Sequence, residues 1–484
     1  MPASYWPTSA ELLRFLPEII LSLAATLIMV LEPFLRARQL FGHLAFGGLV
    51  AALGAAVVAH GSPGPAFSAM LTVDGFATFF RVLILVVGIL TVCASYRYLD
   101  REGASPAEYH ALVLFSITGQ CVLVTAVELV MIFIGLEISS IASYVLAGYL
   151  RDDRRNNEAA LKYFLLGSFA TAFFLYGVAL IYGATGSTSL IGVRELILRP
   201  QSSSTLLLAG IAAALMFVGL AFKVSGAPFQ MWAPDVYQGA PVPVSAFLSA
   251  GPKAAAFAVF LRVYMTAFEP IGGRWQPLLW LSAFLSMTIG NFAALTQSNI
   301  KRMLAYSSIA HAGYVLVALA ARSEIGTAAA MFYLAAYALM NIGAFAVVIH
   351  IAGRQEKYVQ IDDLAGLGDK HPLLAAALSI FLLSLIGVPL TGGFFGKFYV
   401  FKAAIQSNLV WLAVLGLLNS AVAAYYYLRI LVVMYMQDPG EAASSLEPLP
   451  MGLKTALLAP VAGILLLGVF PSVLLDFVTR SAKL

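Results

Sequence analysis

Four ionisable residues lie inside long apolar stretches of the chain. They are Glu137, Lys223, Lys253 and Lys397. A charged side chain at the centre of a membrane-spanning helix costs about 2.5–3.5 kcal/mol, so four unpaired charges would cost about 10–14 kcal/mol. We therefore expect these residues to be paired, hydrated or functional. Titratable groups that are spaced along a line and joined by water can pass a proton from one to the next across a bilayer.

Lysine is suited to such a proton relay. Its pKa of about 10.4 falls by several units when the ammonium group is desolvated and rises again when a carboxylate approaches. Each lysine also adjoins an element that disrupts a helix, namely Pro228 for Lys223, Pro252 for Lys253 and Gly392-Gly393 for Lys397. Helix breaks free backbone carbonyl groups, which can hold water or an ammonium group when they are buried in protein.

Structural roles compete with the relay at these positions. Glu137 and Lys223 could form a static buried ion pair that holds two helices together. Lys253 is harder to explain in this way, because no second carboxylate lies near the middle of a span. His311 fits a packing histidine and a relay site about equally well.

Three arginines lie nearer the ends of apolar stretches. They are Arg81, Arg262 and Arg429. Long cationic side chains at such positions usually extend their charged heads to the membrane surface. We therefore expect structural roles for them, and Arg81 could pair with Asp74.

The overall composition defines the class of protein. Of 484 residues, 61% are hydrophobic and only 52 are charged, as 28 Lys and Arg and 24 Asp and Glu. Soluble domains do not have this balance, whereas about 295 apolar residues would supply about fourteen spans of about 20 residues. A soluble multi-domain enzyme is therefore excluded. A net charge of +4 without long basic runs gives no support for nucleic-acid binding.

Residues that bind redox cofactors or metals are scarce. Cys93 and Cys121 stand apart, with no C-x-x-C motif and no histidine at metal-ligand spacing, so we expect two buried free thiols. Only His311 and His350 lie within apolar stretches, and they do not make a convincing pair of haem ligands. We therefore expect no redox cofactor and no metal in this chain.

The apolar segments predict an all-α polytopic membrane protein with about fourteen transmembrane helices. The run that begins at Phe15 is long enough to span and lacks the basic region of a signal peptide, so we expect it to be the first helix. A membrane barrel is excluded because the segments do not alternate with period two. The predicted spans are 15–33, 40–60, 76–95, 110–126, 128–150, 157–183, 205–236, 243–268, 277–296, 303–320, 326–352, 373–407, 409–436 and 452–473.

Two of these segments are longer than one span and contain glycine and proline. Segment 205–236 contains Ser225-Gly226-Ala227-Pro228, and segment 373–407 contains Gly387 to Gly393. We expect both to be broken helices, each the fourth of five consecutive spans. An odd number of spans makes the second set of five cross the membrane in the opposite sense. Two inverted five-helix repeats with matching broken helices indicate a transport path near the middle of the membrane.

The repeat predicts four regions and an orientation. The regions are a three-helix segment (1–109), two inverted repeats that each form a half-channel (110–268 and 269–436) and a last transmembrane helix (437–484). Loops on one side, with Arg36 and Lys301 among their cations, hold 14 Lys and Arg, while the other loops and the tails hold 8. Because cytoplasmic loops are enriched in Lys and Arg, we predict that both termini lie outside the cytoplasm.

Five passages of the chain resemble one family of membrane proteins. Nearly end to end, the chain is similar to the antiporter-like, proton-pumping membrane subunits that respiratory complex I (NADH:quinone oxidoreductase) shares with multisubunit cation/proton antiporters. The passages that carry the resemblance are Phe15–Ile20, Glu158–Leu165, Phe222–Pro241, Gln297–Tyr314 and Leu383–Phe398.

The resemblance implies a role for each intramembrane charge. Glu137 and Lys223 would form a modulating pair, Lys253 would be the central relay, and Lys397 would face the exit. A lysine at position 397, and the lack of a long lateral helix after the last span, are more similar to one of the three complex I subunits of this kind than to the other two.

One position departs from the family pattern. Family members commonly have a histidine where this chain has Gln230. Glutamine can hold a water chain but does not titrate near neutral pH, so a proton-donor role is in doubt there. Asp235 could substitute, although an acid at a helix end or in a loop is the simpler interpretation.

Two function classes follow from these observations. A third interpretation is a scaffold of helices whose buried charges are inert. In the first, the chain is a subunit of a redox-driven proton pump in a bacterial inner membrane, in contact with lipid and with other membrane and peripheral subunits. NADH, flavin, iron–sulfur clusters and quinone would then be bound by those partner subunits. In the second, the chain belongs to a multisubunit cation/proton antiporter. The passages Phe15–Ile20 and Phe222–Pro241 favour the first class by resemblance.

Overall fold

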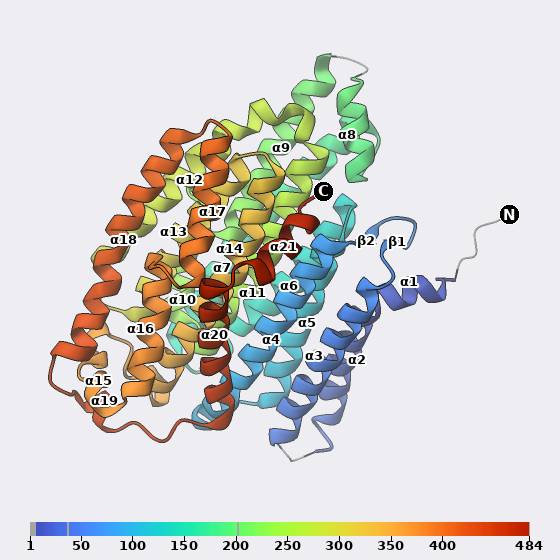
Figure 1. The fold of residues 1–484 in the computed structure, drawn as a ribbon. Helices are drawn as coiled ribbons and strands as arrows, with labels where there is room; N and C mark the ends of the chain where they lie inside the picture. The colour runs from blue at the N-terminus through green and yellow to red at the C-terminus, as the bar shows by residue number, and fades with distance from the viewer. Residues whose placement is uncertain (1–5, 36–37, 201–202, 484) are drawn as a thin grey trace.

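The structure, a computed structural model, describes residues 6–35, 38–200 and 203–483. Arg36, one of the cations in the prediction of orientation, lies outside the described residues. In the described part, twelve helices are long and apolar enough to cross a membrane, and two shorter apolar helices occupy the remaining predicted spans. Each of the fourteen predicted segments therefore contains a helix, and the prediction of an all-α polytopic membrane protein is confirmed (Figure 1).

The N-terminal segment packs at one side of the helical bundle (Figure 1). Its helices are α1 (Ser9–Arg14), α2 (Leu16–Leu31), α3 (Arg38–His60) and α4 (Gly75–Glu102). A small antiparallel hairpin joins α3 to α4 and consists of β1 (Gly64–Ala66) and β2 (Leu71–Val73).

The first repeat follows, and its broken helix is α9 with α10. Its elements are α5 (Pro106–Thr125), α6 (Leu129–Ala147), α7 (Arg154–Thr185), α8 (Leu190–Leu198), α9 (Ser203–Val224), α10 (Trp232–Gly239) and α11 (Val242–Arg262). Two short turns, η1 (Val263–Ala267) and η2 (Glu269–Ile271), lead to the second repeat.

The second repeat has its broken helix at α16 with α17. Its elements are α12 (Gly272–Leu295), α13 (Ile300–Ala320), α14 (Glu324–Ile351), η3 (Arg354–Glu356), η4 (Ile361–Leu364), α15 (Leu367–Lys370), α16 (Pro372–Ile386), α17 (Gly392–Gln406) and α18 (Val410–Met436). The chain then continues through α19 (Glu441–Ser444), α20 (Met451–Val469) and α21 (Ser472–Ser481).

The two repeats are packed in the same way. The first two helices of each lie together, α5 against α6 and α12 against α13. The first and last helices also meet in each repeat, α5 with α11 and α12 with α18. Between the repeats, α11 packs against α14 and α10 packs against α13, so the central helices of both halves form a continuous interior.

Polar side chains satisfy the backbone at the first break. After α9 ends at Val224, the amide of Ala227 donates to Ser286 Oγ at 2.7 Å, and its carbonyl accepts from Ser282 Oγ at 2.6 Å. The indole of Trp232 donates to the carbonyl of Phe222 at 2.8 Å. Irregular backbone at membrane depth is tolerated only where protein or water satisfies it, and here α12 supplies both serines.

The second break depends on glycine. Gly387 ends α16 with a φ of +95°, a conformation that L-residues rarely adopt. A Cβ on Gly393, at the start of α17, would lie 1.9 Å from the carbonyl oxygen of Ser384. Only a residue without a side chain allows the two half-helices to approach this closely.

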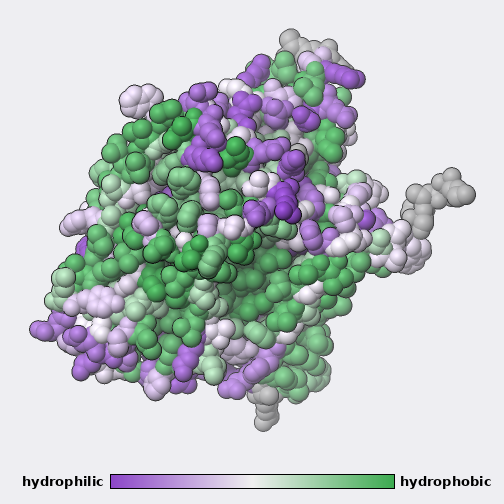
Figure 2. Space-filling model, in the orientation of Figure 1, coloured by the Kyte–Doolittle hydropathy of each residue, from purple (hydrophilic) through white to green (hydrophobic). Residues whose placement is uncertain are grey.

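Apolar side chains cover the outside of the bundle at mid-height. Figure 2 shows a broad hydrophobic band across the molecule, with hydrophilic residues gathered mainly above and below it. Large exposed apolar residues, such as Leu161 and Phe169 on α7 and Leu417 and Leu418 on α18, belong to helices of spanning length. The chain is therefore a multi-pass membrane protein.

Several short elements were not predicted from the sequence, among them the hairpin and one helix of the first repeat. The hairpin β1–β2 and helix α8 are both too short to show a hydrophobic pattern. Both contact the connection between α5 and α6. Leu71 of β2 pairs with Ala126, and Ser189, just before α8, pairs with Glu128. The two cysteines are free and buried, as expected.

Two arginines that were expected to reach the membrane surface are buried and form ion pairs instead. Arg81 does not pair with Asp74 or reach the surface, because it is buried and its Nη2 lies 2.6 Å from Oε1 of Glu18 on α2. Asp74 instead pairs with Arg262, whose Nη1 lies 2.9 Å from the Asp74 carboxylate. Lys301 was counted as a loop cation, but it is fully buried in the first turn of α13.

Candidate functional site

Lys223 lies at the end of α9, beside the first break. Its Nζ donates to Ser140 Oγ at 2.8 Å and to the Tyr163 hydroxyl at 3.4 Å. Its ammonium group also lies 5.5 Å from the centre of the Tyr144 ring. Lys223 is 5% exposed, so neutral polar and aromatic groups replace the water around its charge.

Glu137 does not form a direct ion pair with Lys223. It lies on α6, one turn before Ser140, and its Oε1 is buried with no hydrogen-bond partner among the described residues. The carboxylate is still close enough to act on Lys223 electrostatically. The interpretation as a static contact pair is therefore wrong.

Lys253 joins the first repeat to the second. It follows Pro252 inside α11, and its Nζ donates to Ser308 Oγ on α13 at 2.5 Å. Ser308 Oγ also accepts from the Tyr337 hydroxyl at 2.8 Å, and Tyr337 in turn accepts from Asn341. Lys253 is 2% exposed and faces no carboxylate within ion-pair distance in the described part of the chain. Its ammonium group is thus surrounded by neutral groups, namely the hydroxyl and carbonyl of Ser308 and the ring of Tyr237.

His311 lies one turn after Ser308 on α13. Its Nδ1 is 2.7 Å from the Tyr333 hydroxyl, and its Nε2 is 3.2 Å from the Tyr427 hydroxyl. The Tyr427 hydroxyl also contacts Ser307 Oγ at 2.5 Å. Both ring nitrogens are therefore satisfied by groups that can donate or accept a proton.

Lys397 lies on α17 against the end of α16. Its Nζ donates to the carbonyl groups of Leu385 and Ile386 at 3.0 and 2.8 Å and to Ser420 Oγ at 2.7 Å. These two carbonyls belong to the last turn of a helix and have no helical partner. The expectation that a helix break supplies carbonyls to an ammonium group is confirmed here.

A row of polar residues on α13 connects the lysines. Ser308, His311 and Tyr314 follow one another at intervals of three residues and therefore share one face of the helix. Ser308 holds Lys253 at one end, and the Tyr314 ring lies 4.7 Å from Lys397 Nζ at the other. The structure thus brings Lys253, His311 and Lys397 into one continuous polar row.

Aromatic residues link Lys223 to the same row. The Tyr163 ring stacks on Trp232 with centroids 4.5 Å apart, and Trp232 contacts Tyr237 at 6.0 Å. The Tyr237 ring lies 5.7 Å from Lys253 Nζ. Each lysine therefore shares a pattern that was not predicted: one serine hydroxyl and at least one tyrosine ring.

Gln230 and Asp235 have different roles near the first break. Gln230 Oε1 is buried without a hydrogen-bond partner among the described residues. Asp235 lies 2.7 Å from Lys162 Nζ and 2.7 Å from Arg302 Nη1, so it connects α10 to α7 and α13. The interpretation of Asp235 as an acid with a structural ion pair fits this geometry.

The described residues contain no group of three or more His, Cys, Asp or Glu side chains that could hold a metal ion. The lysines, the histidine and the hydroxyl groups of the site can transfer protons. Buried lysines, a histidine and hydroxyl groups can each donate and accept a proton. An inverted repeat with two broken helices is typical of membrane transporters.

Comparison with known proteins agrees with this class. Residues 126–423 match the family described as NADH:quinone oxidoreductase/Mrp antiporter, transmembrane. The chain is 67% identical to NADH-quinone oxidoreductase subunit N 1 of Solibacter usitatus, over 100% of this chain and 99% of that protein. A chain of respiratory complex I from Thermus thermophilus is 37% identical and superposes with a TM-score of 0.81, covering 95% of this chain and 98% of that one.

A chain of the Mrp complex from Dietzia sp. has the same fold, with a TM-score of 0.84 over 97% of both chains, at 21% identity. The chain belongs to the NADH:quinone oxidoreductase/Mrp antiporter family of membrane subunits. Within this family it groups with NADH-quinone oxidoreductase subunit N, the complex I subunit to which the lysine at position 397 pointed.

Proposed function

We propose that this chain is the subunit of NADH:quinone oxidoreductase that moves protons across the bacterial inner membrane. Electron transfer from NADH to quinone would take place in partner subunits, which would bind the flavin, the iron–sulfur clusters and the quinone. Full-length similarity to subunit N supports this assignment over an antiporter subunit, since the Mrp chain shares the fold at much lower identity.

The observation that carries the proposal is the contact between Lys253 and Ser308. It lies where α11 of the first repeat meets α13 of the second, with Lys223 on one side and Lys397 on the other. We propose that Glu137 sets the charge of Lys223, that Lys253 passes the proton between the repeats, and that His311 and Lys397 carry it onward. The hydrogen-bond partners of all three lysines are neutral, so each lysine can lose its proton more easily than one in direct contact with a carboxylate.

The test is proton uptake per NADH in membrane vesicles at matched complex content. Lys253→Ala should leave the complex assembled and reduce both proton pumping and coupled quinone reduction. Lys253→Arg should not restore pumping, because a guanidinium group keeps its proton. Glu137→Gln should also slow pumping. Normal pumping in both Lys253→Ala and Glu137→Gln would refute the relay.

The antiporter alternative predicts a different dependence. A cation/proton antiporter subunit moves protons in response to an ion gradient, without NADH. Proton movement that follows an imposed sodium gradient in the absence of NADH would favour that alternative. Proton movement that requires NADH oxidation supports the redox-driven pump.

We propose that both termini lie on the non-cytoplasmic side. The excess of Lys and Arg in the loops at the face that carries α15 and α19 supports this orientation. A reporter that is active only outside the cytoplasm should be active when it is fused after Lys483. Activity of a cytoplasmic reporter at the same position would reverse the orientation.

A further inference from the structure

A buried ion pair lies at the loop face of the bundle, outside the relay described above. Lys301 in the first turn of α13 is 0% exposed, and its Nζ lies 2.6 Å from Oε2 of Glu356. The ammonium group also donates to the carbonyl of Ala240 at 2.6 Å. Glu356 Oε1 accepts hydrogen bonds from the Tyr98 hydroxyl at 2.7 Å and from the amide of Val242 at 2.8 Å. The pair therefore connects α4, the start of α11 and α13.

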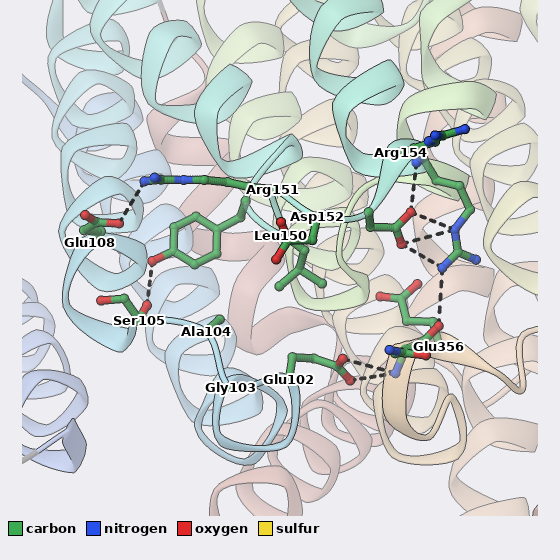
Figure 3. A pocket seen from close by; sticks show the side chains of 14 residues that line it. Glu102, Gly103, Ala104, Ser105, Glu108, Leu150, Arg151, Asp152, Arg154 and Glu356 are labelled. Atoms are coloured by element: carbon green, nitrogen blue, oxygen red, sulfur yellow. Dashed lines mark hydrogen bonds and ion pairs between the residues drawn. The ribbon is translucent and has the colours of Figure 1, made fainter.

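Glu356 is the member of this pair that reaches the aqueous side. It lines a hollow of about 910 Å³ and a neighbouring hollow of about 260 Å³, and Lys301 lines neither. Figure 3 shows the larger hollow, with Glu356 on one wall and the α4–α5 and α6–α7 connections on the others. Three arginines and four further carboxylates line it, the latter being Glu102, Glu108, Asp152 and Asp153. With five carboxylates and three arginines the lining is net negative, and a negative lining raises the local concentration of cations, including protons.

The residues around the hollow fix the position of Glu356. Gln355 and Glu356 have φ angles of +56° and +52°, in the left-handed region that residues with a side chain rarely adopt. The amide of Gln355 donates to the Glu102 carboxylate at 3.1 Å, and its carbonyl accepts from Arg155 at 3.3 Å. Such conformations persist where the surroundings over-determine them, often at functional sites. This turn holds the Glu356 carboxylate against Lys301.

The two segments that hold Lys301 also contact Lys253. Ser308, which holds Lys253, lies seven residues after Lys301 on α13, about two turns or roughly 10.5 Å along the helix axis. Tyr237 lies one turn before Ala240, whose carbonyl binds Lys301. The Tyr237 hydroxyl is buried and makes no hydrogen bond to a described residue, and its ring faces Lys253. A buried hydroxyl with free donor and acceptor capacity can pass on a proton.

We propose that Glu356 and Lys301 form the site where protons from the cytoplasmic side are loaded onto the relay. A proton from the larger hollow binds the Glu356 carboxylate, and the neutral acid no longer holds Lys301 in its charged form. Lys301 then releases one proton through the Tyr237 hydroxyl to the neutral amine of Lys253. The proton on Glu356 moves to Lys301 and restores the ion pair. One proton thus leaves the hollow, one reaches Lys253, and the pair returns to its starting charges.

The inference rests on the proposed function of Lys253, and its test uses the complete complex in membrane vesicles. Lys301→Arg keeps a positive charge beside Glu356 but cannot release its proton. Loss of a positioned proton-transfer group commonly costs about 100-fold in rate, so we expect proton uptake at least roughly tenfold slower at wild-type complex content. Wild-type uptake in this variant would overturn the proposal.

A double variant separates proton loading from a purely structural ion pair. Glu356→Gln with Lys301→Met removes both charges together, and such replacement of a buried ion pair often leaves stability unchanged or raised. Under the proposal the complex assembles but takes up protons slowly. If the pair is only structural, the assembled double variant pumps normally. Failure of the double variant to assemble would also count against the proposal, since it would assign the charges to folding.

The neighbouring exposed ion pair provides the matched control. Lys357 Nζ lies 3.0 Å from Glu441, and the two side chains are 61% and 72% exposed. Lys357→Met with Glu441→Gln should therefore pump like the wild type. Lys253→Ala distinguishes failure of the proposed function from failure of the loading site alone. Normal pumping in Lys253→Ala removes the proposed function itself, whereas loss there with normal pumping in the Lys301 variants removes only the loading site.

Discussion

Replacing Gly119 by alanine should separate the two helices that form the Lys223 site. At Gly119, α5 crosses α6 so closely that a Cβ would lie 2.5 Å from the amide nitrogen of Ser139 and 2.7 Å from the carbonyl oxygen of Gly135. Ordinary van der Waals contact begins at 3.4 Å, so α6 must retreat by 0.9 Å, the difference between 3.4 and 2.5 Å. Ser140 is the next residue on α6. If Ser140 moved away from Lys223 by the same amount, the 2.8 Å hydrogen bond between Lys223 Nζ and Ser140 Oγ would lengthen to about 3.7 Å. That separation is beyond hydrogen-bond distance.

We expect this change to reduce both assembly and pumping. An extra methyl group in a packed interior commonly costs about 1–3 kcal/mol, and a misplacement of about 1 Å near a reacting group can lower the rate by about 100-fold. The assay is proton uptake per assembled complex in vesicles, beside complex content in the same membranes. Gly183→Ala on α7 is the control, because nothing lies within 4 Å of its Cβ position. Wild-type uptake per complex in Gly119→Ala would show that the α5–α6 crossing does not position the lysine.

Two further predictions concern charges outside the relay. Glu18→Gln should lower the free energy of unfolding of the purified complex by about 3–5 kcal/mol, because it leaves the guanidinium of Arg81 buried without its counter-charge. The melting temperature should therefore fall, and an unchanged melting temperature would contradict this. Asp153 is partly buried, which raises its pKa, but hydrogen bonds donated by Arg155 lower that pKa further, to below the ordinary value of 3.8. Its carboxylate therefore stabilises the fold above the pKa of the unfolded chain and loses this effect only in acid, so Asp153→Ala should lower the melting temperature equally at about pH 6 and about pH 8. A loss that differs between these two pH values would assign the effect to another group.

The spans and the broken helices could be predicted from the sequence because both leave strong local signals. An apolar run of spanning length is hard to place anywhere but in a membrane, and a glycine–proline interruption within such a run ends a helix wherever it packs. The carbonyl cage around Lys397 could be foreseen for the same reason. Its ligands Leu385 and Ile386 lie just before the break that frees them.

The partners of the other lysines could not be foreseen. Ser140 is 83 residues from Lys223 and Ser308 is 55 residues from Lys253, so the contacts depend on how separate helices pack. Serine is also common within these apolar segments, and nothing in its local sequence marks one that binds an ammonium group. The prediction of a partner for Arg81 failed for a related reason. A closer acid in the sequence, Asp74, was the obvious candidate, but the packing of α2 places Glu18 beside the guanidinium.

The contacts that hold the first break limit how the protein can move. Serines of α12 hold the interrupted backbone at Ala227, and the Trp232 indole ties the second half-helix to the end of the first. Stacking of Trp232 on Tyr163 adds a rigid aromatic contact. A segment fastened at so many points is a poor hinge, so the two half-helices have little freedom to rock against each other. Protons would then travel by rotation of lysine and hydroxyl groups within a nearly stationary scaffold, on the timescale of side-chain motion rather than of domain closure.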